Sequence, residues 1–148
     1  MNVLSAILGA ALIAGVALSG FNYINSGAYK NREDAALAET GLQSLAAAYQ
    51  SRRLAGGSSP NPSTWRAELF PAYGQEPKAP QGFSWSFGAA DDGQWFCMSS
   101  SQAADRAKPF LEALKHRFSA QALEVADKCG GKAAGTGTGI AATLWVSK

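Results

Sequence analysis

The residues that could do chemistry in this sequence are few and dispersed. The single histidine, His116, stands between Lys115 and Arg117 in a segment with helical spacing. A Ser-His-Asp or Cys-His arrangement would therefore depend on one residue in a charged, solvent-facing neighbourhood. Asp91 and Asp92 are adjacent carboxylates, but neighbouring residues at a hairpin tip point apart, which favours a solvated turn over a metal or acid–base site. We expect the chain not to be an enzyme.

Two further patterns are weak signals. Residues 135–139, GTGTG, fit neither of the glycine-rich phosphate-binding motifs, and no helical pattern follows them, which favours a loop. A set of aromatic side chains could form a carbohydrate platform, although aromatic residues in strands more often belong to a core. The set is Trp65, Trp85, Trp95, Trp145, Phe83, Phe87 and Phe96. We expect no cofactor and no metal.

The two cysteines, Cys97 and Cys129, have no cysteine or histidine partners at metal-ligand spacing, which argues against a zinc site. Outside the cytosol an even number of cysteines favours one disulfide, whereas in the cytosol both would be buried thiols. The N-terminal sequence bears on that choice.

The first 29 residues, here called the arm, contain no charged side chain. A run of about 20 apolar residues can cross a hydrocarbon core of about 30 Å, and residues 3–24 reach that length. A cleaved signal peptide would need a positive n-region, which the arm lacks. The arm therefore predicts a membrane span, and its start resembles the product of processing that removed a charged leader.

Helical spacing continues beyond the arm through residues 31–54. Arg52-Arg53 and then Gly56-Gly57 supply a stop signal. We expect one helix over residues 2–54, about 80 Å long at ~1.5 Å per residue, whose N-terminal half protrudes. Its second half carries an apolar stripe of Ala38, Leu42, Leu45 and Tyr49.

The remaining sequence predicts a small antiparallel sheet. A short helix follows a loop, with Asn61 as N-cap and Pro62 in its first turn, and residues 71–82 form an irregular loop. Alternation in FSWSF and the QWFCMSS run predict a hairpin around Asp91-Asp92-Gly93. A helix over 101–118 follows, which Pro109 could interrupt or restart. ALEVADKC fits a strand or a helix end, of which we favour the strand, and IAATLWV suits a strand added late to the sheet. The order is a long helix, a loop, meander-like strands, a helix and a terminal strand, which indicates an α+β body.

Composition allows one domain of modest size in addition to the arm. The chain has 148 residues, 16% of them charged, and a formal net charge of +2. That charge is too small to indicate a nucleic-acid-binding protein. We therefore expect residues 1–29 to be an apolar helical arm and residues 30–148 a globular α+β portion with the long helix packed on its sheet.

An uncharged N-terminus, one long helix with an apolar first half, an α+β body and two cysteines in the C-terminal half together resemble the type IV pilin family. A first residue of Met is more similar to the type IVb subgroup. The resemblance implies cleavage by a prepilin peptidase before Met1, N-methylation of Met1 and storage in the inner membrane. It also implies that the pilus assembly machinery builds identical subunits into an extracellular fibre for adhesion, conjugation or DNA uptake. Cys97 and Cys129 would match the disulfide that closes the variable C-terminal region.

The resemblance also assigns assembly residues in the arm. Small residues such as Gly9 and Ala10 would allow helices to approach closely in lipid and in the fibre core. Backbone near Gly15, Ser19 and Gly20 would lose helical structure on assembly, because glycine weakens a helix and no proline is present there. The expected interface comprises Met1, Val3, Leu4, Ser5, Ile7, Leu8, Leu12, Ile13, Val16 and Leu18.

One residue departs from the pilin pattern. Pilins usually carry Glu at position five of the mature chain, where it pairs with the amino terminus of a neighbour, and here the residue is Ser5. A serine cannot neutralise a buried charge. Two alternatives therefore stay open: a minor pilin or type II secretion pseudopilin that primes or caps a fibre, and a single-span membrane protein with a periplasmic binding head.

Overall fold

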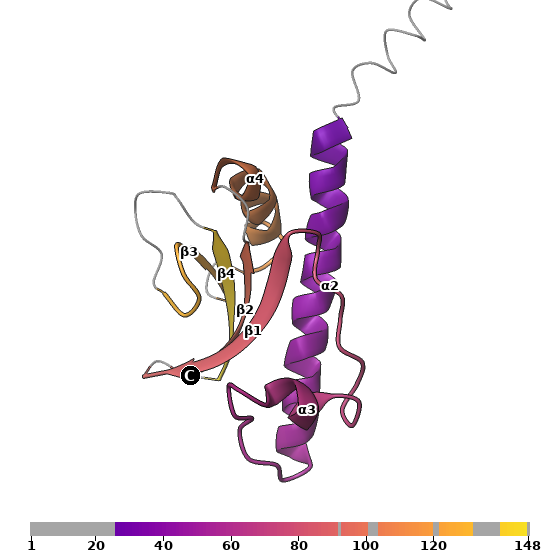
Figure 1. The fold of residues 1–148 in the computed structure, drawn as a ribbon, viewed down its shortest axis with the longest axis vertical. Coiled ribbons are helices and arrows are strands. Elements are labelled where there is room, and N and C mark those ends of the chain that lie inside the picture. Colours follow the sequence, from indigo (N-terminus) through magenta and orange to yellow (C-terminus); the bar gives the residue numbers. More distant parts are fainter. Residues whose placement is uncertain (1–25, 92, 101–103, 120–121, 132–139, 148) are drawn as a thin grey trace, which may run out of the picture. The chain divides into compact units, whose positions relative to one another are not determined.

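One long helix and one antiparallel sheet dominate the fold (Figure 1). The computed structural model describes residues 26–91, 93–100, 104–119, 122–131 and 140–147. The chain divides into two compact units, Met1–Lys30 and Asn31–Lys148, and we call the second unit the head. The described elements are α2 (Ser26–Leu54), α3 (Trp65–Leu69), β1 (Phe83–Ala90), β2 (Gly93–Ser100), α4 (Ala104–Lys115), β3 (Leu123–Ala126) and β4 (Ala141–Ser147).

The four strands form one sheet in the order β1-β2-β4-β3, and every neighbouring pair is antiparallel. β1 and β2 form the expected hairpin, in which Ala90 lies opposite Gly93. The α+β class and the antiparallel sheet predicted from the sequence are confirmed.

The order of the strands in the sheet, which the sequence analysis does not predict, differs from their order along the chain. After β2 the chain passes through α4 and β3, and β4 then enters the sheet between β2 and β3. β4 suits a central position because Ala141, Ala142, Thr143 and Leu144 are consecutive buried residues, so both of its faces are covered in this half. The short β3 is left at the edge.

The core lies between the sheet and the two longer helices. Alternate residues of each strand face α2 and α4, and we call this side the inner face. It includes Trp85 and Phe87 of β1, Phe96 and Met98 of β2, and Leu144 of β4, all buried. The opposite side, with Trp95, Cys97 and Thr143, is the outer face.

α2 contributes the predicted stripe to this core. Leu42 and Leu45 are fully buried, and Ala38 and Tyr49 are buried beside them. The helix ends at Leu54 as predicted, because Gly56 adopts φ 81° and the amides of Gly56 and Gly57 bond to the carbonyls of Arg53 and Arg52.

α3 begins later than predicted. Its first residue is Trp65 and the residue before it is Thr64, so Asn61 is not its N-cap. Asn61 instead accepts the Ser63 amide on its side-chain oxygen at 2.9 Å and the Thr64 amide on its carbonyl at 3.0 Å. A local turn at residues 61–64 thus takes the hydrogen bonds that a helix starting at Pro62 would need.

α4 continues through Pro109 without interruption. A proline in a helix interior costs about 3 kcal/mol because it removes a backbone donor and crowds the preceding turn. Here Ala107 precedes Pro109 and Phe110, Leu111 and Leu114 follow it, and all four are buried against the sheet. Tertiary packing on both sides of Pro109 therefore outweighs the local cost.

Candidate functional site

The assembly residues expected in the arm lie outside the described residues. They include the proposed processed residue, Met1, the interface and the segment expected to unwind. The set is Met1, Val3, Leu4, Ser5, Ile7, Leu8, Leu12, Ile13, Gly15, Val16, Leu18, Ser19 and Gly20. The domain division after residue 29 likewise stays a prediction.

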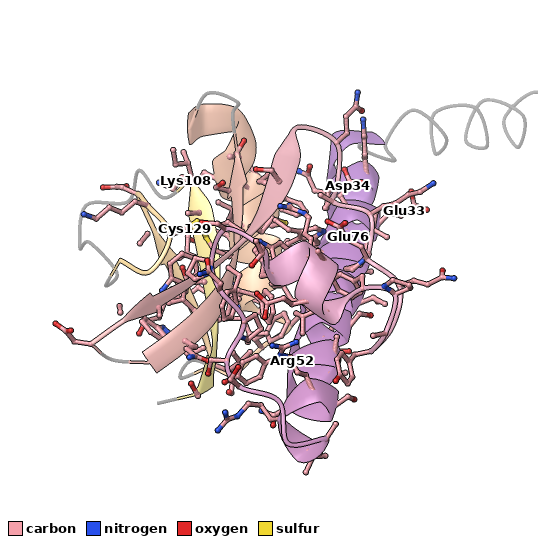
Figure 2. The ribbon with its side chains drawn as sticks, turned by 60° about the horizontal axis from the view of Figure 1, so that its bottom comes forward. Glu33, Asp34, Arg52, Glu76, Lys108 and Cys129 are labelled. Atoms are coloured by element: carbon pink, nitrogen blue, oxygen red, sulfur yellow. A yellow bond between two sulfur atoms is a disulfide. The ribbon has the colours of Figure 1, made fainter. Side chains whose placement is uncertain are left out.

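The disulfide joins the outer face of the sheet to the segment after β3. Cys97 on β2 and Cys129 are bonded, with 5.6 Å between their Cα atoms, and Cys97 is fully buried. The Ser86 hydroxyl lies 3.5 Å from Cys129 Sγ. The Thr143 hydroxyl donates to Cys97 Sγ at 3.7 Å and accepts the Gly130 amide at 3.0 Å. One covalent bond and a small polar cluster thus hold residues 129 and 130 against β1, β2 and β4; Figure 2 labels Cys129 on the side of the sheet away from α2.

Trp95 lies between two glycines on this outer face. A Cβ atom at Gly88, its partner on β1, would stand 2.3 Å from Trp95 Cζ2, and one at Gly130 would stand 2.7 Å from Trp95 Nε1. The indole therefore occupies space that side chains at these two positions would fill. Its N–H is buried and has no hydrogen-bond partner among the described residues.

The aromatic set of the sequence divides between the two faces. Trp65, Trp85, Phe87 and Phe96 are buried in the core, as the core interpretation predicts. Phe83 is partly buried and packs against that core. Trp95 and Trp145 are half-buried on the outer face, where they lie opposite each other and Trp145 donates to Glu124 at 3.1 Å.

The residues first considered for chemistry are not brought together. His116 is exposed just after α4 and lines a shallow cavity of about 260 Å³ with Glu112, Lys115 and Phe118. Asp91 is exposed at the hairpin tip, and Asp92 and the 135–139 loop lie outside the described residues. In the described part of the chain, no three metal-ligating side chains come together.

An arginine–glutamate clamp is the site that sequence reasoning missed. Arg52, at the C-terminal end of α2 (Figure 2), donates to Glu68 Oε2 at 2.6 Å and to the Ser58 carbonyl at 2.8 Å. Glu68 Oε1 accepts the Thr64 hydroxyl at 2.6 Å and the Asn61 amide at 3.0 Å. The Thr64 and Asn61 bonds, with the Arg52 charge, hold the pKa of Glu68 below its usual value. The clamp fastens the 55–64 loop to both helices.

A second arginine, Arg66, binds the edge of the sheet at β1. Arg66 on α3 donates to the Trp85 carbonyl at 2.7 Å and to Glu76 Oε1 at 2.7 Å, and its guanidinium lies 4.4 Å from the centre of the Trp65 ring. Trp85 in turn donates its indole N–H to the Pro77 carbonyl at 2.9 Å. These contacts hold the 71–82 loop against the start of β1.

Comparisons with protein families, curated proteins and solved structures found no match for this chain. Among the helices of the described residues, none is long and apolar enough to span a membrane.

Proposed function

We propose that this chain is the structural subunit of a type IV pilus, of the type IVb kind, and that it polymerises through its apolar arm. On this proposal it resides in the inner membrane after cleavage by a prepilin peptidase and methylation of Met1, and the assembly machinery then builds it into an extracellular filament. Its partners are identical subunits, and the filament serves adhesion, conjugation or DNA uptake.

The observation that carries the proposal is an uncharged apolar arm that precedes a head with a core of its own. Among the residues whose burial is described, the buried stripe of α2 begins at Ala35, and the described core consists of Ala35 and later residues. The uncharged residues 1–29 precede it in the sequence. An uncharged segment of this length favours an apolar partner, such as lipid or other subunits.

The architecture of the head supports the same proposal. A long helix packed on an antiparallel sheet, with a disulfide linking the sheet to the segment after β3, is compatible with a pilin-like fold. Ser5 favours a second candidate, a minor pilin or a type II secretion pseudopilin, because this position lacks the carboxylate that usually pairs with a neighbouring amino terminus.

Microscopy of sheared cell-surface material tests the proposal. We expect filaments that an antibody against the head labels along their length. Substituting Ile13→Asp should abolish them, because a buried carboxylate in the apolar arm is costly. The matched control Leu37→Asp changes an apolar residue that is 47% exposed on the head, and should leave the chain folded.

Label found only at filament ends would favour the minor-subunit candidate. Surface material without filaments, from cells that hold the chain in the inner membrane, would contradict both and favour a single-span protein with a binding head.

A further inference from the structure

The two sulfur atoms of the disulfide lie in different surroundings. Cys97 is on β2, which lies between β1 and β4 in the sheet, and it is fully buried. Cys129 is in the segment after β3 and is half-buried. A thiol in solution therefore has unequal access to the two ends of the bond.

Cys97 is enclosed by its neighbours on the outer face. Ser86 of β1 and Thr143 of β4 lie opposite it in the two strand pairings, one on each side. Cys129 is bonded to its sulfur atom, and the exposed fraction of Cys97 is 0%. An external thiol therefore cannot reach Cys97 Sγ in the folded head, whereas Cys129 belongs to a residue that keeps contact with solvent.

Each sulfur atom accepts a hydrogen bond from one hydroxyl group. A disulfide sulfur carries no hydrogen, so the Ser86 hydroxyl is the donor to Cys129 Sγ at 3.5 Å. The Thr143 hydroxyl donates to Cys97 Sγ at 3.7 Å, while its oxygen accepts the Gly130 amide at 3.0 Å. A hydroxyl donor stabilises negative charge on sulfur. Thr143 is itself fully buried, so this donor lies where Cys97 has no exposure to water.

We propose that Cys129 is a site of thiol–disulfide exchange, at which a small thiol opens the bond and forms a mixed disulfide. The thiolate of the small molecule attacks Cys129 Sγ, so a new sulfur–sulfur bond forms there and the bond to Cys97 breaks. The electron pair of the broken bond leaves on Cys97 Sγ, which then takes a proton from water. The Thr143 hydroxyl stabilises this departing sulfur. The inference does not rest on the proposed function.

A second small thiol completes the reduction. Its thiolate attacks the small-molecule sulfur of the mixed disulfide, and Cys129 leaves as a thiolate that takes a proton from water. The protein disulfide thus gains two electrons and two protons, and the two small thiols lose them and become one disulfide. In the reverse direction, a small disulfide oxidises the head through the same mixed disulfide on Cys129, and Cys97 then displaces the small thiol.

The direct test treats the full chain in detergent micelles with an excess of reduced glutathione. Samples are quenched at early times with N-ethylmaleimide, digested and mapped by mass spectrometry. We expect glutathione on Cys129 and maleimide on Cys97, about tenfold or more over the reverse pattern. In concentrated guanidinium chloride, which unfolds the head, the two patterns should be similar in amount. Equal amounts in the folded protein, or glutathione mainly on Cys97, would overturn the proposal.

Two single-cysteine variants give the answer if the mixed disulfide of the wild type is too short-lived to detect. Cys97→Ala keeps the Cys129 thiol, Cys129→Ser keeps the Cys97 thiol, and neither variant can displace a bound glutathione. With oxidised glutathione, the Cys129 thiol should react about tenfold or more faster than the Cys97 thiol in the folded protein. The two rates should be similar in guanidinium chloride. Equal rates in the folded variants would overturn the proposal.

The role of the Thr143 hydroxyl is tested by the sign of its effect. Thr143→Val removes the hydroxyl and should slow opening by glutathione about fivefold, the effect of roughly one hydrogen bond. Ser86→Ala is the matched control, because its hydroxyl bonds to the sulfur that does not leave, and it should change the rate less. If Thr143 only held the Gly130 segment in place, its loss would loosen that segment and speed opening. An unchanged or raised rate would therefore refute its role, and none of these results bears on the filament proposal, which microscopy tests.

Discussion

The two faces of the sheet are stabilised in different ways. On the inner face, Phe96 is fully buried and its ring lies 5.0 Å from that of Phe87 and 5.5 Å from that of Trp65. The outer face is stabilised by a disulfide, by one buried threonine and by a tryptophan between two glycines.

The difference follows from what covers each face. α2 and α4 supply buried apolar side chains to the inner face, so the hydrophobic effect stabilises it. The described segment over the outer face, residues 127–131, offers no large apolar side chain, so a covalent link and close backbone approach hold it in place. We therefore expect the stability of the head to depend on side-chain volume at the inner face. At the outer face we expect it to depend on the redox state of the disulfide and on added Cβ atoms.

The largest effect is expected at the centre of the inner face. Phe96→Ala should lower the free energy of unfolding by about 3–5 kcal/mol, because it removes a buried ring and leaves a cavity. Chemical denaturation followed by circular dichroism measures the loss. Phe118→Ala, at a half-buried position beyond α4, is the control and should cost less; equal losses would show that the inner face is not the main core.

The disulfide should give the second effect. Replacing Cys97→Ala together with Cys129→Ser should cost about 3–4 kcal/mol of stability, because the bond closes a segment with a sequence separation of 32. Reductant should lower the melting temperature of the wild type and leave the variant unchanged. Intact mass should differ by two hydrogens with and without reductant, and two free thiols under non-reducing conditions would refute the pairing.

A single methyl group on the outer face tests its close packing. Gly88→Ala should cost about 1–3 kcal/mol, because its Cβ would stand 2.3 Å from Trp95 Cζ2. In a Trp95→Ala background the same change should be neutral or stabilising, since alanine suits a strand better than glycine. Thermal melts of the four proteins complete a double-mutant cycle, and additive effects would argue against the close contact.

The Glu68 clamp should give a smaller, pH-dependent effect. The pKa of Glu68 is lowered in the folded head from 4.5, so its stabilisation is fully present above about pH 4.5 and is lost as pH falls through the lowered value. Glu68→Gln should reduce the acid-side loss of stability. Thr64→Val removes a hydroxyl donor to Glu68 and should move that loss of stability toward higher pH. If the melting temperatures of the wild type and both variants coincide between pH 2 and 7, Glu68 does not stabilise the head through these bonds.

The smallest effect on the head is expected from removing the arm. A chain that begins at Lys30 should be soluble and folded, because the described core draws on Ala35 and later residues. Its melting temperature should match that of the full chain in detergent. An unfolded circular dichroism spectrum would mean that the arm belongs to the core, and the filament proposal would lose its main support.

Local patterns predicted much of the head. The 3.6-residue period of α2 identified Leu42 and Leu45 as buried, and the alternation of β1 identified Trp85 and Phe87. These predictions succeeded because a single buried face imposes its period on the residues that form it. The arm residues proposed for assembly remain predictions, since they lie outside the described residues.

Contacts between residues far apart in the chain could not be predicted from the sequence. The sequence indicates Arg52 only as a cation near a helix end, because its bond with Glu68 depends on where the 55–64 loop returns. Pro109 indicated a possible break, which packing of Phe110 and Leu111 overrides. Gly88 carried no signal at all, because its role is set by Trp95 on the neighbouring strand.

The sequence by itself thus determined the uncharged arm, the position of most elements and the α+β class. Each of these depends on residues that are neighbours along the chain, where helix and strand periods act directly. Only the tertiary structure decided that β4 enters between β2 and β3 and that β1 and β3 are the outer strands of the sheet. Strand order depends on which apolar faces meet across long loops, and many orders satisfy the same local patterns until the core is packed.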